Sequence, residues 1–359
     1  MITAKVVFFP LDRQLEVMER NWSESIIREA TWLSGVSGSY AQAEEVLIRI
    51  GKINLDDSTI WRHVKKRGEI LQEAAEKRKE KALALPQIGE RPHQPSAGAD
   101  HMGPRGHPGL DGAMVNIREE GWKEFKVGAV YEIAERPTCD PITGEWVNIA
   151  CAVNNSYVAH LGDAQAFGPF LWSEAQARGW EDARHTQTIG DGAHWGPEGT
   201  PNLADEYFPY SVRTLDWYHA SEYLHNAARL LFPASDSATT RWFNHAETLL
   251  FQGQAETIAT AISDKIERNP ALACDELSAA MTYFQHNHKR MQYRAFREDG
   301  FPIGSGMVES AAKQFKARFT GPGMRWSRKG LQRLIPIRSA VLSQSFDALW
   351  NSVFISPLN

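Results

Sequence analysis

The chain has 359 residues, enough to bury a large core and to form two or three domains. Its content of 42% hydrophobic and 23% charged residues is that of a globular protein and excludes disorder throughout. The net charge of -5 excludes indiscriminate binding to nucleic acid, so any such role must rest on local patches.

Three cysteines occur, and none forms a CxxC pair, which argues against a disulfide framework or a zinc ribbon and fits a reducing compartment. The sequence also has no apolar run long enough for a membrane span and no signal peptide at Met1. We therefore predict a cytoplasmic protein without a membrane partner.

Residues 1–87 are predicted to form a helical N-terminal domain. An amphipathic helix over 41–50 is followed by a break at Gly51–Asn54 and by a basic helix with Asp57 at its N-cap. This layout is typical of a helix-turn-helix DNA reader, but a three-helix packing unit with a solvated charged face fits equally well. In the first interpretation, the DNA-contacting residues of the basic helix are Arg62, Lys65 and Lys66.

Residues 88–110 are rich in proline and glycine, which indicates a linker and a domain boundary. Between 111 and 219, strands expected near 112–116, 122–133, 146–153, 185–190 and 211–216 alternate with helices expected near 172–179 and 200–207. This order predicts an α/β layer with a sheet at its centre. Residues 220–300 are predicted to be all-helical, including one helix over 275–297, and residues 301–359 return to the core with basic helices.

Four acids occur at expected strand or helix ends, namely Asp111, Asp191, Asp216 and Glu309. Asp111 and Asp191 each precede a Gly-Ala pair, and Glu309 follows the flexible Gly304–Gly306 turn. Metal-dependent phosphodiester chemistry commonly uses two divalent ions about 4 Å apart, held by a few carboxylates. The sequence therefore predicts such a site at Asp111, Asp191 and Glu309, if the strands bring them together.

The stretch Ser310–Ser345 contains no acidic residue and eight basic ones. A run of one sign directly behind a carboxylate favours a phosphate backbone as its partner over a merely solvated face. The candidate DNA-contacting residues here are Lys313, Lys316, Arg318, Arg325, Trp326 and Arg328, although a packed side chain is an equally good interpretation of Trp326.

Several motifs in this order resemble those of the Kra-type bacterial insertion-sequence transposases, a group within the Mutator-like DDE transposases. They are Leu110–Val115 with Gly121–Gly128, Gly190–Trp195, Asp216–Glu222, Ile303–Ser310 and Gly323–Ser327. The resemblance extends over about residues 8 to 350.

The resemblance implies an RNase H-like mixed-sheet core interrupted by an all-helical insertion. It implies that Asp111, Asp191 and Glu309 are the catalytic triad holding two Mg²⁺ or Mn²⁺ ions, with Asp216 and His219 as supporting residues of a C/D-x-x-H motif. The expected activity is cleavage of double-stranded DNA at element ends and strand transfer, by a homodimer or larger synaptic assembly in the nucleoid.

Family members usually carry a zinc ribbon before the segment Phe8–Asp12, which this chain lacks. That departure predicts an N-terminally truncated copy or a start codon assigned too late. An active transposase and an inactive DNA-binding remnant therefore both remain open, while a carboxylate-pair glycosidase, which would need no metal, is less favoured.

Overall fold

The computed structural model describes residues 17–18, 22–85, 105–107, 110–139, 145–183, 185–192 and 202–355. For residues 17, 18, 105–107, 110 and 111 it describes the backbone alone. Most of the linker expected at 88–110 lies outside these ranges.

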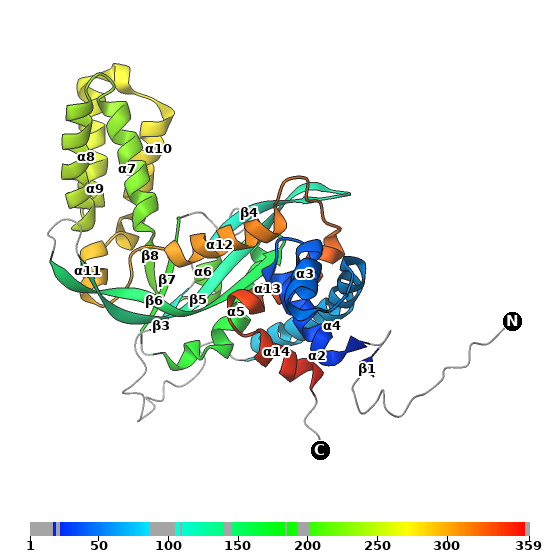
Figure 1. The fold of residues 1–359 in the computed structure, drawn as a ribbon. Helices are drawn as coiled ribbons and strands as arrows, with labels where there is room; N and C mark the ends of the chain where they lie inside the picture. Colours follow the sequence, from blue (N-terminus) through cyan, green and yellow to red (C-terminus); the bar gives the residue numbers. More distant parts are fainter. Residues whose placement is uncertain are drawn as a thin grey trace, which may run out of the picture.

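The fold is mixed α/β, as predicted, and is built on one central sheet (Figure 1). Its strands are β3 (Arg105–His107), β4 (Leu110–Ile117), β5 (Gly121–Cys139), β6 (Trp146–Leu161), β7 (Thr186–Gly190) and β8 (Val212–Leu215). A separate two-stranded hairpin is formed by β1 (Val17–Met18) and β2 (Trp22–Ser23). The five strands expected from sequence between 112 and 216 are confirmed, although β6 continues eight residues past the expected end at 153.

The strands form an antiparallel part and a parallel part. β6 pairs with one edge of β5, while β3 and β4 pair with successive stretches of its other edge, all antiparallel. β3 then pairs in parallel with β7, and β7 pairs in parallel with β8. Across the sheet the order is therefore β6, β5, the β3 and β4 position, β7 and β8.

The middle of β5 is buried on both faces, because helices cover the sheet from two sides. Phe125 and Val127 share a cluster with Phe315 and Phe319 of α12 (Gly306–Phe319). Residues of the opposite parity face α5 (Ala164–Ala177), which packs so closely that a Cβ at Gly128 would lie 2.9 Å from its side chains. Side chains alternate along a strand, so this pattern defines a helix–sheet–helix sandwich.

The N-terminal helices pack on the C-terminal ones. α2 (Glu24–Val36), α3 (Tyr40–Val46) with a π-helical turn at Leu47–Gly51, and α4 (Asp57–Leu83) precede the sheet, whereas α13 (Arg328–Leu342) and α14 (Phe346–Phe354) end the chain. Each of these helices contributes buried residues to one hydrophobic cluster, and Leu47 of the π-helical turn also belongs to it. The cluster includes the face of the sheet that α12 covers. Residues 22–85 therefore share a core with residues 311–354 and have no separate one.

The expected helix, break and basic helix are present in this region, but the N-cap of the last helix was wrongly placed. Asp56 caps α4, because its Oδ1 accepts the backbone N–H of Thr59 at 2.9 Å. Hydrogen bonds from the Ser58 hydroxyl and from the Thr59 hydroxyl and N–H lower the pKa of Asp56 to about 2. Asp57 is the first helical residue instead.

Between residues 217 and 298, all of them described, the chain forms only helices and turns. The helices are α7 (Trp217–Leu231), α8 (Asp236–Phe251), α9 (Ala255–Arg268), α10 (Asp275–Asn287) and α11 (Tyr293–Glu298). They have their own hydrophobic cluster and stand as a column that rises from one end of the sheet (Figure 1). The single helix expected over 275–297 is wrong, since a 3-10 turn at His288–Arg290 separates α10 from α11.

Within the described part of the chain, no helix combines the length and the apolarity needed to cross a bilayer.

Candidate active site

Two of the four predicted acids lie where neighbouring strands end. Asp191 directly follows β7, and Asp216 directly follows β8, whose register pairs Gly190 with Leu215. The backbone N–H of Asp216 donates to the carbonyl of Gly190 at 2.7 Å, so the two acids leave the sheet side by side.

The Asp-Gly pair at 191 and 192 has a clear steric reason. Gly192 has φ of 90°, and a Cβ there would lie 2.6 Å from the side chain of Leu215. Only glycine fits this turn without strain, and it lets the chain bend sharply just after Asp191. The Asp-Gly pair is therefore explained by packing, because the turn after Asp191 has no room for a side chain at position 192.

Asp111 lies in β4, where its backbone pairs with Val127 of β5; its side chain is outside the described part of the structure. β3 and β4 occupy the strand position beside β7, and β4 is in contact with β7. The backbone of Asp111 and the turn with Asp191 are therefore on adjacent strands.

Glu309 lies in the first turn of α12, the helix that packs on β4 and β5. Its side chain is half exposed, and its Oε2 lies 3.7 Å from the Nζ of Lys313 one turn later. Such an exposed ion pair is weak, so the carboxylate is free to exchange it for another cation.

No three His, Cys, Asp or Glu side chains in the described residues are grouped so that they would hold a metal ion. The Asp111 side chain is not among those residues, so this finding does not test the expected group of Asp111, Asp191 and Glu309. The donors themselves suit a hard cation, since all three are carboxylates.

Asp216 differs from the other acids in being almost fully buried, with 2% of its surface exposed. Its Oδ1 accepts the N–H of His219 at 2.7 Å, which caps α7, and its Oδ2 accepts the N–H of Ser305 at 2.5 Å. Both expected supporting residues, Asp216 and His219, are thus joined through the start of one helix.

Aromatic residues of the helical column lie over this end of the sheet. Tyr283 of α10 stacks on Tyr223 of α7 with ring centroids 4.0 Å apart, and the His219 ring lies 5.4 Å from Tyr223. Burial raises the pKa of Tyr283, and the neighbouring Tyr223 and Asp191 side chains raise it further. Sequence reasoning missed Tyr283, because it is more than 90 positions from Asp191 and belongs to no motif.

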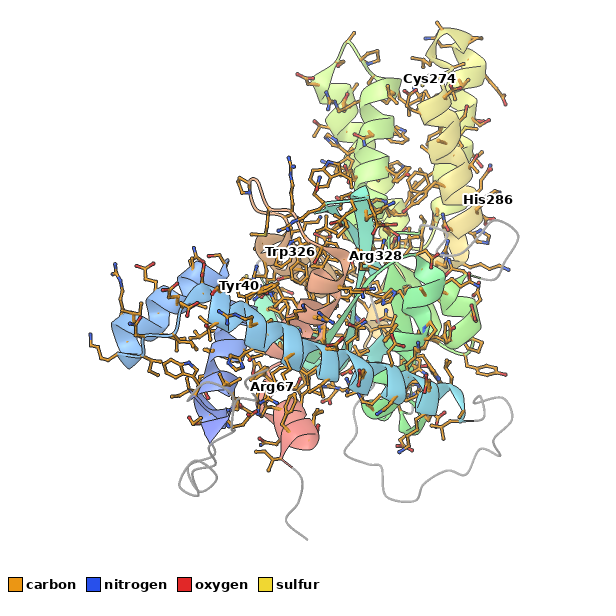
Figure 2. The ribbon with its side chains drawn as sticks, turned by 90° about the vertical axis from the view of Figure 1, so that its right-hand side faces the viewer. Tyr40, Arg67, Cys274, His286, Trp326 and Arg328 are labelled. Carbon is orange, nitrogen blue, oxygen red and sulfur yellow. The ribbon has the colours of Figure 1, made fainter. Side chains whose placement is uncertain are left out.

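Figure 2 shows the orientation of this column, with Cys274 near its far end and His286 closer to the sheet. α10 therefore approaches the sheet with its C-terminal end, which explains how Tyr283 reaches Gly192, where a Cβ would lie 3.5 Å from its ring.

The candidate DNA-contacting residues divide into exposed and buried groups. Arg62, Lys65, Lys66, Lys313 and Arg325 are exposed, and Lys316 and Arg328 are partly exposed. Arg328 also forms two hydrogen bonds of 2.6 Å with the carboxylate of Glu120.

Arg318 and Trp326 are in the interior instead. The Arg318 guanidinium donates to the carbonyls of Ser34 and Gly38, and its carbon Cζ lies 5.2 Å from the ring centroid of Trp326. Trp326 donates its indole N–H to the carbonyl of Phe319 at 2.9 Å. Both side chains hold helices together in this structure, so the packed interpretation of Trp326 fits it, and Arg318 does not face solvent.

Basic residues from the two ends of the chain line one cleft of about 440 Å³, where α4 meets the start of α13. Lys65 and the half-exposed Trp61 come from α4, and Arg328 and Lys329 come from α13. Figure 2 shows α4 crossing the molecule, with Arg67 on it and Tyr40, which also lines the cleft, close by. A second cavity, of about 400 Å³ between α4, α5, β6 and α13, is lined by none of the predicted site residues.

No protein-family model matches the chain, and no curated protein matches it significantly.

Proposed function

We propose that the chain is a metal-dependent DDE transposase, with Asp111, Asp191 and Glu309 as its catalytic carboxylates. The observation that carries this proposal is the placement of these residues on adjacent elements: Asp111 in β4, Asp191 at the end of the neighbouring β7, and Glu309 in the first turn of α12 over β4. Residues 80 and 118 positions apart in the sequence thereby lie on neighbouring elements of the fold, which supports the proposal.

The strand order supports an RNase H-like core. The sheet begins with three antiparallel strand positions, the first being β6, the second β5, and the third shared by β3 and β4. The parallel strands β7 and β8 follow. The chain enters this sheet in its middle and adds strands first to one side and then to the other. In this proposal, residues 217–298 are the all-helical insertion between the second parallel strand and the helix that carries Glu309.

Two Mg²⁺ or Mn²⁺ ions held by these carboxylates would activate the attacking oxygen and stabilise the leaving oxygen at a DNA phosphodiester. The chain's own residues supply the position of each carboxylate. The Gly192 turn fixes where Asp191 leaves β7, and α12 packing on β4 fixes the helix turn that carries Glu309. Lys313 pairs with Glu309 in this structure. When Glu309 binds a metal ion instead, the Lys313 ammonium group would become available to contact a DNA phosphate.

Double-stranded DNA is the proposed partner, bound through its phosphates. Arg62, Lys65 and Lys66 are exposed on α4, and Lys65 shares one cleft with Arg328 and Lys329 of α13, although Glu119 also lines this cleft. Each Lys or Arg placed on a phosphate releases condensed counterions, so we expect binding to weaken steeply with salt. Cleaving and joining two element ends calls for at least two copies of the chain in one assembly.

The proposal is tested by an end-cleavage assay on DNA from the flanks of the gene, with Mg²⁺ or Mn²⁺ and with EDTA. We expect new 3′-hydroxyl ends with the unaltered chain and loss of cleavage in Asp191→Asn, because an amide binds a divalent ion far more weakly than a carboxylate. Asp347→Asn is the matched control, since Asp347 is a mostly exposed acid on α14.

Binding of this DNA by the unaltered chain without any cleavage would favour the inactive DNA-binding remnant. Cleavage that survives EDTA, or an Asp191→Asn chain that cuts as well as the unaltered one, would contradict the proposed carboxylate site.

A further inference from the structure

Asp216 joins three segments that the proposed site needs. Its backbone N–H donates to the carbonyl of Gly190, the residue just before Asp191. Its Oδ1 accepts the N–H of His219 at the start of α7, and its Oδ2 accepts the N–H of Ser305, the residue before α12. One residue therefore contacts the end of β7, the first helix of the column and the start of the helix that carries Glu309.

A second backbone contact reinforces this junction. The N–H of Trp217 donates to the carbonyl of Ile303 at 2.9 Å, so residues 216–217 hold the segment 303–305 at two points. The carbonyl of Ser305 in turn accepts the N–H groups of Val308 and Glu309, which form the first turn of α12. The position of the Glu309 backbone is thus set through Ser305 by the Asp216 carboxylate.

The Asp216 carboxylate is poorly suited to bind a metal ion itself. It is 2% exposed, and each of its oxygens already accepts a short hydrogen bond from a backbone N–H. Backbone donors and the N-terminus of the 15-residue helix α7 stabilise its negative charge without a cation. Asp191 and Glu309, in contrast, are at least partly accessible.

We infer that Asp216 is a positioning residue that fixes the Glu309 helix against the Asp191 strand through its hydrogen bond with Ser305, and that it is not a metal ligand. This inference rests on the proposed function. In this role, the acid of the Asp-x-x-His sequence connects the first helix of the column to the segments that carry Asp191 and Glu309, and it thereby helps to set the distance between those two carboxylates.

The hydrogen bond can be removed from either side. In Asp216→Asn one oxygen remains for two N–H groups; because asparagine caps helix N-termini through this oxygen, we expect it to keep the N–H of His219, which leaves the NH₂ group unable to accept the N–H of Ser305. In Ser305→Pro the donor is lost while Asp216 stays intact. Ser305→Ala is the matched control, because it removes only the hydroxyl and keeps the N–H.

We expect Asp216→Asn and Ser305→Pro each to raise the Mn²⁺ concentration that gives half-maximal DNA cleavage by about 10- to 100-fold, as residues that orient metal ligands do. Saturating Mn²⁺ should restore most of the rate, and the double variant should be no worse than the more affected single one, since both act on one hydrogen bond. Ser305→Ala should behave as the unaltered chain. If Asp216→Asn cannot be rescued by metal and Ser305→Pro has no effect, Asp216 is a ligand and the inference fails.

Hydrogen exchange of the amides in residues 303–310 gives a readout that needs no activity. We expect exchange at least about tenfold faster in Asp216→Asn and unchanged in Ser305→Ala, because the segment loses one of its two anchors. Unchanged exchange in Asp216→Asn would overturn the inference even if the chain is an active nuclease. Faster exchange in a chain that cuts no DNA would support the junction and reject only the proposed function.

Discussion

Arg318 offers a direct test of whether a basic residue of the C-terminal run serves packing or DNA. Its side chain is 2% exposed, with Nε donating to the Ser34 carbonyl at 3.0 Å and Nη1 donating to the Gly38 carbonyl at 3.2 Å. Its Cζ lies 5.3 Å from the ring centroid of Tyr40 and 5.2 Å from that of Trp326. The guanidinium therefore joins α12 to α2 and α3.

The cost of losing this guanidinium follows from these contacts. Hydrogen bonds to a charged group contribute about 1.5–3 kcal/mol each, and each cation–π contact adds about 0.5–2 kcal/mol. Burying a guanidinium costs several kcal/mol, which an uncharged side chain of similar length avoids. We therefore expect Arg318→Met to lower the free energy of unfolding by about 3 kcal/mol, mainly because two buried carbonyls lose their donors. Desolvation also lowers the pKa of Arg318 in the folded chain.

Urea unfolding followed by tryptophan fluorescence measures this change, and DNA affinity at fixed salt is measured on the same proteins. Arg325→Gln is the matched control, because Arg325 belongs to the same basic run and is exposed. We expect it to change the free energy of unfolding by less than about 0.5 kcal/mol and to weaken DNA binding. An Arg318→Met chain that is as stable as the unaltered one but binds DNA as weakly as Arg325→Gln would refute this reasoning.

Two further predictions concern stability. Burial lowers the pKa of His160, which stacks on Phe170, below its ordinary value of about 6.5, so the unfolded chain takes up a proton that the folded chain resists. The free energy of unfolding should therefore fall as the pH drops below about 6.5, and an equally steep fall in His160→Phe would exclude this residue as the cause. In α4, a Cβ at Gly68 would lie 2.3 Å from the Arg333 carbonyl oxygen, so Gly68→Ala should cost about 1–3 kcal/mol in thermal or urea unfolding although alanine favours helix. Gly306→Ala in α12, where no atom lies within 4 Å of such a Cβ, should cost nothing, and equal effects of the two would reject the steric argument.

Five strands of the sheet were predictable because each carries a local signal, whereas β3 (Arg105–His107) was missed, since it lies in the proline- and glycine-rich stretch expected to be a linker. β5 has β-branched and aromatic residues over Phe125–Tyr131, and β7 ends in an Asp-Gly turn whose glycine the packing requires. The start of α5 was misplaced by eight residues, since Pro169 lies inside this helix and proline usually marks a boundary. The expected Asp57 cap was one residue late, because two consecutive aspartates satisfy the same local rule.

The roles of single side chains in the site were less predictable, because they depend on segments far apart in the chain. Arg318 and Arg325 look alike in a basic run, yet one is buried under α2 and the other is exposed. Asp216 resembles the other strand-end acids in the sequence, but in the structure it is buried and accepts the N–H of Ser305, 89 positions away. Whether Asp111, Asp191 and Glu309 meet around metal ions stays a prediction.

The shared core of the two chain ends has a consequence for synthesis. Ile27, Leu71, Leu331 and Trp350 belong to one hydrophobic cluster, so α2 and α4 leave the ribosome long before the residues that cover them exist. The column at 217–298 can close its own cluster in the meantime, whereas the N-terminal helices keep apolar surface exposed to chaperones until α13 and α14 emerge. In a nascent chain that stalls before residue 328, the helices at 217–298 would therefore be folded, whereas α2 and α4 would still expose apolar surface. We expect proteases to degrade such a chain readily.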